Sequence, residues 1–127
     1  MHVLLLEPDN LLAASLNNYL AREGHSVAWH SHPQDAVTSA DRQTPQAVIT
    51  ELQLAGRSGV EFLYEFRSYP EWQAIPIIVL SNLRPEETIA YQEVFQELNI
   101  AGYFYKPRTN LSQLLETLET SSQPART

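Results

Sequence analysis

The chain has 127 residues, the length of one ordinary domain, and its 43% hydrophobic content is enough for a buried core. It contains no cysteine, which excludes disulfides and thiolate chemistry, and its formal net charge of −7 argues against binding to nucleic acid or to anionic membranes. The apolar start, MHVLLLE, is too short for a membrane span and lacks the basic region of a signal peptide, so we expect a cytoplasmic protein.

Five short apolar segments alternate with five amphipathic segments along the chain. The apolar segments predict strands at residues 3–6, 25–30, 47–50, 75–81 and 103–105. The amphipathic segments predict helices at residues 10–22, 33–42, 59–67, 85–98 and 110–119. Asp9 and Asn110 are suited to cap the first and last helices, and Pro33 suits the first turn of the second. This alternation predicts an α/β fold with a doubly wound parallel sheet that helices cover on both faces.

The predicted elements form one unit without an internal repeat. We expect a single domain over residues 1–120, in which the five strands share one sheet. Residues 121–127 are polar and are expected to form a tail or the start of a linker.

Polar residues stand where four of the predicted strands end. Glu7 follows the first strand and Glu51 the third, while Ser81 ends the fourth. Lys106, the only lysine in the chain, follows the fifth. Because ligands of doubly wound sheets bind beyond the carboxyl ends of the strands, we expect these four side chains to gather at one edge of the sheet.

Several stretches together resemble the receiver domain of response regulators. They are VLLLEPD, LAREGHSV, VITELQLAGRSGVEFL, IPIIVLSN and GYFYKP, and the resemblance extends from residue 3 to about residue 118. It implies a flavodoxin-like fold with five parallel strands in the order 2-1-3-4-5 and five helices. It also implies a role in two-component signalling, in which a histidine kinase donates a phosphoryl group to an aspartate at the end of the third strand. A Mg²⁺ ion held by acidic residues assists that transfer.

Four positions match the pattern of that family. Lys106 matches the lysine and Ser81 the hydroxyl residue that contact the phosphoryl group. Tyr103 matches the aromatic switch position, and Glu7 matches the first member of the acidic pair. The resemblance also makes the Lys106–Pro107 bond a candidate cis peptide.

Two central positions depart from the pattern. Glu51 stands where the phosphoacceptor aspartate belongs, and Pro8 replaces the second member of the acidic pair. Glutamate moves the carboxylate outward by one C–C bond, roughly 1.5 Å, and a misplacement of about 1 Å can cost ~100-fold in rate. Pro8 offers no side-chain oxygen to Mg²⁺. We therefore expect no phosphorylation at position 51, no cofactor, and at most a weak Mg²⁺ site at Glu7 and Glu51; Asp9 is expected to cap the first helix instead.

Each of these residues also has a purely structural interpretation. Glu51 either pairs with Lys106 in place of a phosphate or is a solvated carboxylate on a scaffold that has lost its chemistry. Glu7 is expected to be a structural partner of Lys106 or of backbone amides. Ser81 is suited to cap the loop that follows it, and Tyr103 to be packed permanently.

Three classes of function stay open. The preferred one is an unphosphorylated receiver that binds a protein partner or a second copy through residues 85–98, 103–105 and 110–119. A histidine kinase or an output domain belongs among the expected partners. The second class is a receiver still regulated by phosphorylation or Mg²⁺, and the third is an inert structural domain attached to an output module. The sequence contains no nucleophile–base pairing and no cofactor motif, so we expect no enzymatic activity.

Overall fold

A five-stranded parallel sheet forms the centre of the computed structural model, which describes residues 1–54 and 57–122. Its strands are β1 (His2–Leu6), β2 (Ser26–His30), β3 (Ala47–Thr50), β6 (Ile77–Ser81) and β7 (Gly102–Tyr105). They lie in the order β2-β1-β3-β6-β7. Counted along the chain within this sheet, the order is 2-1-3-4-5, so the prediction of a flavodoxin-like doubly wound sheet is confirmed.

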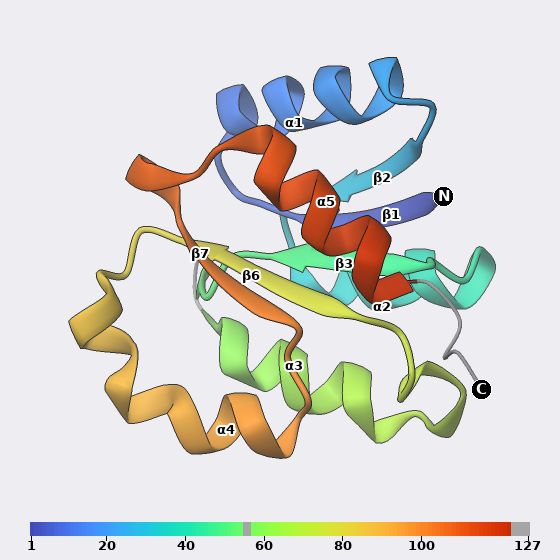
Figure 1. The fold of residues 1–127 in the computed structure, drawn as a ribbon. Helices are drawn as coiled ribbons and strands as arrows, with labels where there is room; N and C mark the ends of the chain where they lie inside the picture. Colours follow the sequence, from blue (N-terminus) through green and yellow to red (C-terminus); the bar gives the residue numbers. More distant parts are fainter. Residues whose placement is uncertain (55–56, 123–127) are drawn as a thin grey trace.

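Five α-helices cover the two faces of the sheet (Figure 1). They are α1 (Asn10–Arg22), α2 (Pro33–Arg42), α3 (Gly59–Ser68), α4 (Gln92–Glu97) and α5 (Leu111–Ser122). Helices α1 and α5 lie on one face, and α2, α3 and α4 lie on the other (Figure 1). Single turns of 3-10 helix, or short runs of it, occur at η1 (Pro70–Trp72), η2 (Pro85–Tyr91) and η3 (Lys106–Arg108).

The strands at the centre are mostly apolar because both of their faces are buried. In β1, Val3 and Leu5 belong to the core beneath α1 and α5. Leu4 and Leu6 belong to the core beneath α2, α3 and α4. Strands β3 and β6 repeat this division, which explains their continuous apolar runs. The two cores fix the sheet from both sides and hold the carboxyl ends of its strands in register.

The chain after β6 is the largest departure from the predicted helices. Residues 85–98 are predicted as one α-helix, but the structure forms the 3-10 segment η2 before the short helix α4. The Thr88 hydroxyl donates to the Pro85 carbonyl, and Ile89, an apolar residue of this segment, is 71% exposed. Burial therefore gives η2 little of the tertiary packing that stabilises most α-helices.

Two smaller departures concern chain segments with weak sequence signals. Strands β4 (Gln53–Leu54) and β5 (Arg57–Ser58) form a short antiparallel pair that the sequence does not predict. Helix α5 continues to Ser122, whose hydroxyl donates to the Glu119 carbonyl, although the helix is predicted to end at residue 119. Of the predicted polar tail, residues 123–127 lie outside the described part.

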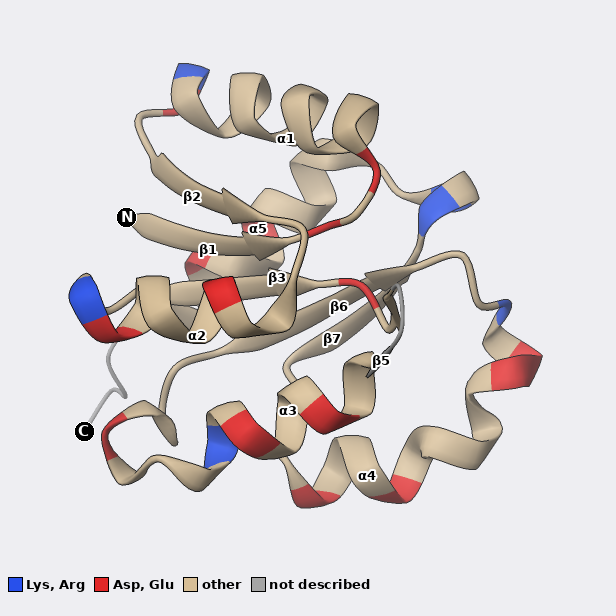
Figure 2. Ribbon diagram, turned by 180° about the vertical axis from the view of Figure 1, so that it is seen from behind, with Lys and Arg blue, Asp and Glu red and all other residues tan. Residues whose placement is uncertain are grey.

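Charge is distributed unevenly over the helices. Figure 2 shows acidic segments along α3 and α4, on the face of the sheet opposite α1 and α5.

Within residues 1–54 and 57–122, none of the helices combines the length and the apolar character needed to cross a bilayer.

Candidate functional site

Glu7, Glu51 and Lys106 meet at the carboxyl edge of the sheet. The Glu51 amide donates to the Leu6 carbonyl (3.0 Å), which places the end of β3 beside the end of β1. Lys106 Nζ lies 2.9 Å from Glu7 Oε1 and 2.8 Å from Glu51 Oε1. The Lys106 side chain is 13% exposed, and the carboxylate side chains are 1% and 2% exposed. We call these three residues the Glu7–Lys106–Glu51 triad; it contains the Glu51–Lys106 pair, one of the two alternatives that the sequence leaves open for Glu51.

The remaining oxygens of both carboxylates accept backbone hydrogen bonds. Glu7 Oε2 accepts from the Asp9 amide at 2.9 Å. Glu51 Oε2 accepts from the Leu52 amide at 2.6 Å and the Gln53 amide at 3.0 Å. The additional methylene of a glutamate thus lets the Glu51 side chain turn back onto the loop that follows it. Each carboxylate oxygen of the triad is bonded to a donor within the protein, so Glu51 is buried rather than solvated.

Burial and charge act in opposite directions on the triad. Burial raises the pKa of Glu7 above its ordinary value of 4.5, although the Asp9 amide and the Lys106 ammonium oppose the rise. Burial alone lowers the pKa of Lys106. The hydrogen bonds and charges of Glu51 and Glu7 outweigh burial, so this pKa lies above its ordinary 10.5. The ammonium therefore stays charged and neutralises one of two buried negative charges.

The donor set around the triad suits Mg²⁺ poorly. Pro8 has no side-chain oxygen, and Asp9 Oδ1 accepts from the Leu11 and Leu12 amides, so Asp9 caps α1 as predicted. The remaining carboxylates, Glu7 and Glu51, are both already bonded to an ammonium group. Among residues 1–54 and 57–122, no cluster of three or more His, Cys, Asp or Glu side chains has the arrangement of a metal site. A small cation that demands near-octahedral oxygen coordination would have to displace Lys106.

Ser81 at the end of β6 and Tyr103 on β7 both bond to the segment that follows β6. Ser81 is fully buried, and its hydroxyl accepts from the Leu83 amide at 3.3 Å. The Tyr103 hydroxyl donates to the Leu83 carbonyl. Burial is the main reason that the pKa of Tyr103 is raised. Both residues therefore hold the loop between β6 and η2, the arrangement expected from the structural interpretation of Ser81.

The prediction of a cis peptide at Lys106–Pro107 is wrong, because the bond is trans. The chain turns here by another route. Pro107 lies within the 3-10 turn η3, where its fixed φ suits the helical conformation. The Thr109 amide closes the turn by donating to the Lys106 carbonyl at 3.2 Å.

Sequence reasoning misses two residues that shape the site. Gly59 approaches the backbone so closely that an added Cβ would lie 2.5 Å from Leu52 Cα and 2.7 Å from Glu51 O. Its only sequence signal is a glycine at the start of a predicted helix. Trp29 Nε1 donates to the Glu7 carbonyl at 2.9 Å, and nothing in the local pattern of β2 distinguishes it from a packed aromatic residue.

Known proteins that resemble this chain share both its sequence pattern and its fold. The response regulator receiver domain family matches residues 3–119. The KDP operon transcriptional regulatory protein KdpE of Escherichia coli K12 is 31% identical over 87 residues, which are 68% of this chain and 37% of KdpE. The chain thus spans little more than a third of such curated relatives.

Solved structures agree with this assignment at the level of the fold. A sensor protein from Polaromonas sp. JS666 superposes with a TM-score of 0.86 at 21% identity, over 95% of this chain and 94% of that one. The BeF3-activated N-terminal receiver domain of Klebsiella pneumoniae RstA gives a TM-score of 0.83 at 21% identity, over 98% and 100% of the two chains. With the family match over residues 3–119, the chain belongs to the response regulator receiver domains of two-component signal transduction.

Proposed function

We propose that this receiver domain regulates a protein partner by binding it and does not accept a phosphoryl group at position 51. One observation carries the proposal. Lys106 Nζ contacts two buried carboxylates at 2.8 Å and 2.9 Å, in a site where the resemblance implies a lysine that contacts the phosphoryl group.

The chemistry of phosphoryl transfer supports this reading. The transfer depends on a positioned nucleophile and on neutralisation of the transferring group. Glu51 Oε1 is bonded to Lys106 and Oε2 to two backbone amides, so attack by either oxygen requires breaking those contacts. Pro8 removes a metal ligand. The two losses are independent, and we propose that Mg²⁺ is not part of this domain's function.

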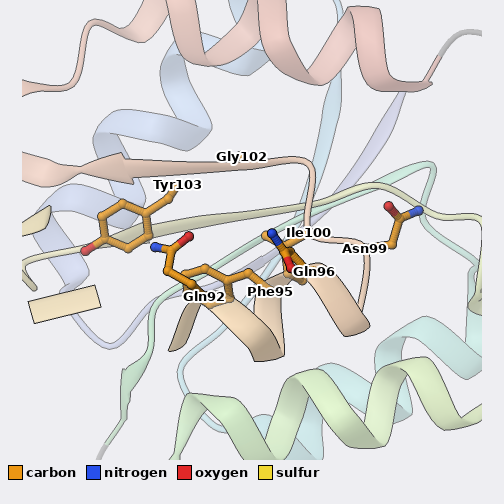
Figure 3. A pocket seen from close by; sticks show the side chains of 7 residues that line it. All are labelled: Gln92, Phe95, Gln96, Asn99, Ile100, Gly102 and Tyr103. Atoms are coloured by element: carbon orange, nitrogen blue, oxygen red, sulfur yellow. The ribbon is translucent and has the colours of Figure 1, made fainter. Parts of the chain in front are cut away.

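We further propose that Glu51 stands in for the phosphoryl group by occupying Lys106. The occupied Lys106 would act on the surface formed by η2, α4, β7 and α5, where a partner would bind. Tyr103 of β7 packs against Phe95 of α4 with ring centroids 6.1 Å apart, and Figure 3 shows its ring lying over Gln92 and Phe95. A groove of about 420 Å³ runs between α4 and β7 at this point. A histidine kinase, an output domain or a second copy would bind this face in the cytoplasm, without catalysis by the domain and without nucleic acid.

Phosphorylation assays test the first part of the proposal. The wild-type chain, incubated with acetyl phosphate and Mg²⁺, should show no gain of a phosphoryl group by intact mass spectrometry. The double variant Pro8→Asp, Glu51→Asp should gain one, because it restores both the acceptor and the metal ligand. Glu51→Asp alone is the matched control and should react more slowly than the double variant. Uptake at residue 51 of the wild type would favour the second class, a receiver still regulated by phosphorylation.

The variant Glu51→Gln tests the second part. It keeps the shape of the side chain but removes the charge that faces Lys106. We expect the amide resonances of Leu83 and Tyr103 to shift, because the loop and β7 respond to the occupied lysine. Glu116→Gln, an exposed change on α5, is the control and should leave those resonances in place. Unchanged Leu83 and Tyr103 signals in Glu51→Gln would instead support an inert structural domain.

A further inference from the structure

The carbonyl group of Glu7 has an unusual partner. Strand β1 pairs with β2 as far as Leu6 and His30, and the Glu7 amide still donates to the His30 carbonyl at 3.0 Å. Beyond this point the two strands no longer pair, and Pro8 has no amide hydrogen with which to continue the hydrogen-bond ladder. The Glu7 carbonyl accepts instead from the indole Nε1 of Trp29 at 2.9 Å.

Trp29 is less buried than the other tryptophan of the chain. Trp29 is 38% exposed on β2, which is an edge strand of the sheet. It belongs to neither of the two core clusters, whereas Trp72, the other tryptophan, is 2% exposed within one of them. Trp29 thus makes a specific hydrogen bond to a strand-end carbonyl while part of its ring stays in solvent.

We propose that Trp29 is a positioning residue for the Glu7–Lys106–Glu51 triad. Its indole fixes the carbonyl of Glu7, while the His30 carbonyl fixes the amide of the same residue. With both ends of its backbone held, Glu7 directs Oε2 to the Asp9 amide and Oε1 to Lys106. The proposal concerns the geometry of the triad and does not depend on whether residue 51 is phosphorylated.

The contacts form a continuous path from the surface to the buried lysine. It runs from the indole N–H to the Glu7 carbonyl, and from the Glu7 carboxylate to the Asp9 amide and to Lys106 Nζ. Loss of the indole donor frees the β1–α1 turn on one side. The Asp9 amide and the Lys106 ammonium are therefore the two groups that should respond first.

Hydrogen exchange of the folded protein separates a local response from a global one. In Trp29→Phe, which keeps an aromatic ring but lacks the donor, the Asp9 amide should exchange about fivefold faster, the equivalent of about one net hydrogen bond. The protection of the β6 amides should change only as much as the free energy of global unfolding changes. Because Lys106 is the only lysine, lysine-specific ¹⁵N labelling gives one side-chain signal, and it should shift in the same variant.

Trp72→Phe is the matched control, because it alters the other tryptophan inside the core. It should accelerate exchange at β6 and leave the Lys106 signal unchanged. A second measurement needs no variant: the indole N–H of Trp29 should be protected from exchange in the wild type. The proposal is overturned if Trp29→Phe leaves Asp9 and Lys106 unchanged, or if the wild-type indole N–H exchanges as freely as in a solvated side chain.

Discussion

Replacement of Lys106 by methionine should lower the free energy of unfolding by about 3–5 kcal/mol at neutral pH, the range for removing one partner of a buried ion pair. Methionine fills a similar volume but brings no charge. Glu7 and Glu51, at 1% and 2% exposure, would then face each other without the cation that bonds both. Their mutual repulsion in a site of low dielectric adds to the loss of two charge-assisted hydrogen bonds.

The pH dependence of this loss gives the prediction a specific signature. In the variant, the Lys106 ammonium no longer opposes the rise in the pKa of Glu7 above 4.5, so the folded state binds a proton at Glu7 more tightly. Its stability should therefore recover as the pH falls below neutral. In the wild type, the raised pKa of Lys106 gives stability that is present below pH 10.5 and is lost as the pH rises further. The variant should lack that alkaline loss.

Urea unfolding at several pH values measures both effects. The double variant Lys106→Met, Glu51→Gln should regain part of the stability at neutral pH, because only one buried charge remains. Arg84→Met is the control for loss of an ion pair, since Arg84 pairs with Glu87 at 2.9 Å while 62% exposed, and it should unfold nearly as the wild type does. A small effect of Lys106→Met that does not vary with pH would show that the triad is solvated.

Much of the fold can be predicted from local patterns in the single sequence. Helices α1 and α2 begin and end where predicted because Asp9 caps the first and Pro33 occupies the first turn of the second. Strands buried on both faces consist mostly of consecutive apolar residues, which makes β1, β3 and β6 easy to predict. Since carboxyl ends of parallel strands share an edge, the meeting of Glu7, Glu51 and Lys106 also follows from the order of the elements.

The features that the sequence does not reveal depend on contacts between distant segments. Whether Glu51 points to solvent or turns back onto the Leu52 and Gln53 amides is decided by loop geometry and by the place that Lys106 takes. The trans bond before Pro107 and the 3-10 form of η2 are settled by small differences in local energy. A charged residue at the end of a helix, such as Arg67, is expected to be solvated until its neighbours are known.

Arg67 is in fact buried at the end of α3 and bonds to backbone carbonyls on two other segments. Its Nε donates to Leu98 O at 2.8 Å, and Nη2 donates to Asn99 O at 3.3 Å. Its Nη1 donates to Trp72 O at 2.8 Å and Ile75 O at 2.7 Å. Burial lowers the pKa of Arg67 below its ordinary value, yet a guanidinium stays protonated in proteins. The side chain thus ties the end of α4 to the segment that leads into β6.

Arg67→Met should lower the free energy of unfolding by about 3 kcal/mol, because buried carbonyls lose their donor and the methionine replaces none of the bonds. Arg67→Lys, which keeps the charge but not the planar fork, should lose a smaller amount. Chemical denaturation measures the loss in the free energy of unfolding for each variant. Hydrogen exchange shows which helices lose protection. We expect the amides of α4 to lose protection before those of α3.

That order follows from how little else holds α4. The helix has six residues, follows the 3-10 segment η2, and is anchored mainly by Phe95, by Leu98 and by the carbonyls that Arg67 binds. If Arg67→Met instead lowered the exchange protection of α3 and α4 equally, the guanidinium would stabilise both helices alike, as a core residue does. If α4 alone loosens, Arg67 sets the stability of the face proposed to bind a partner, independently of the triad at the edge of the sheet.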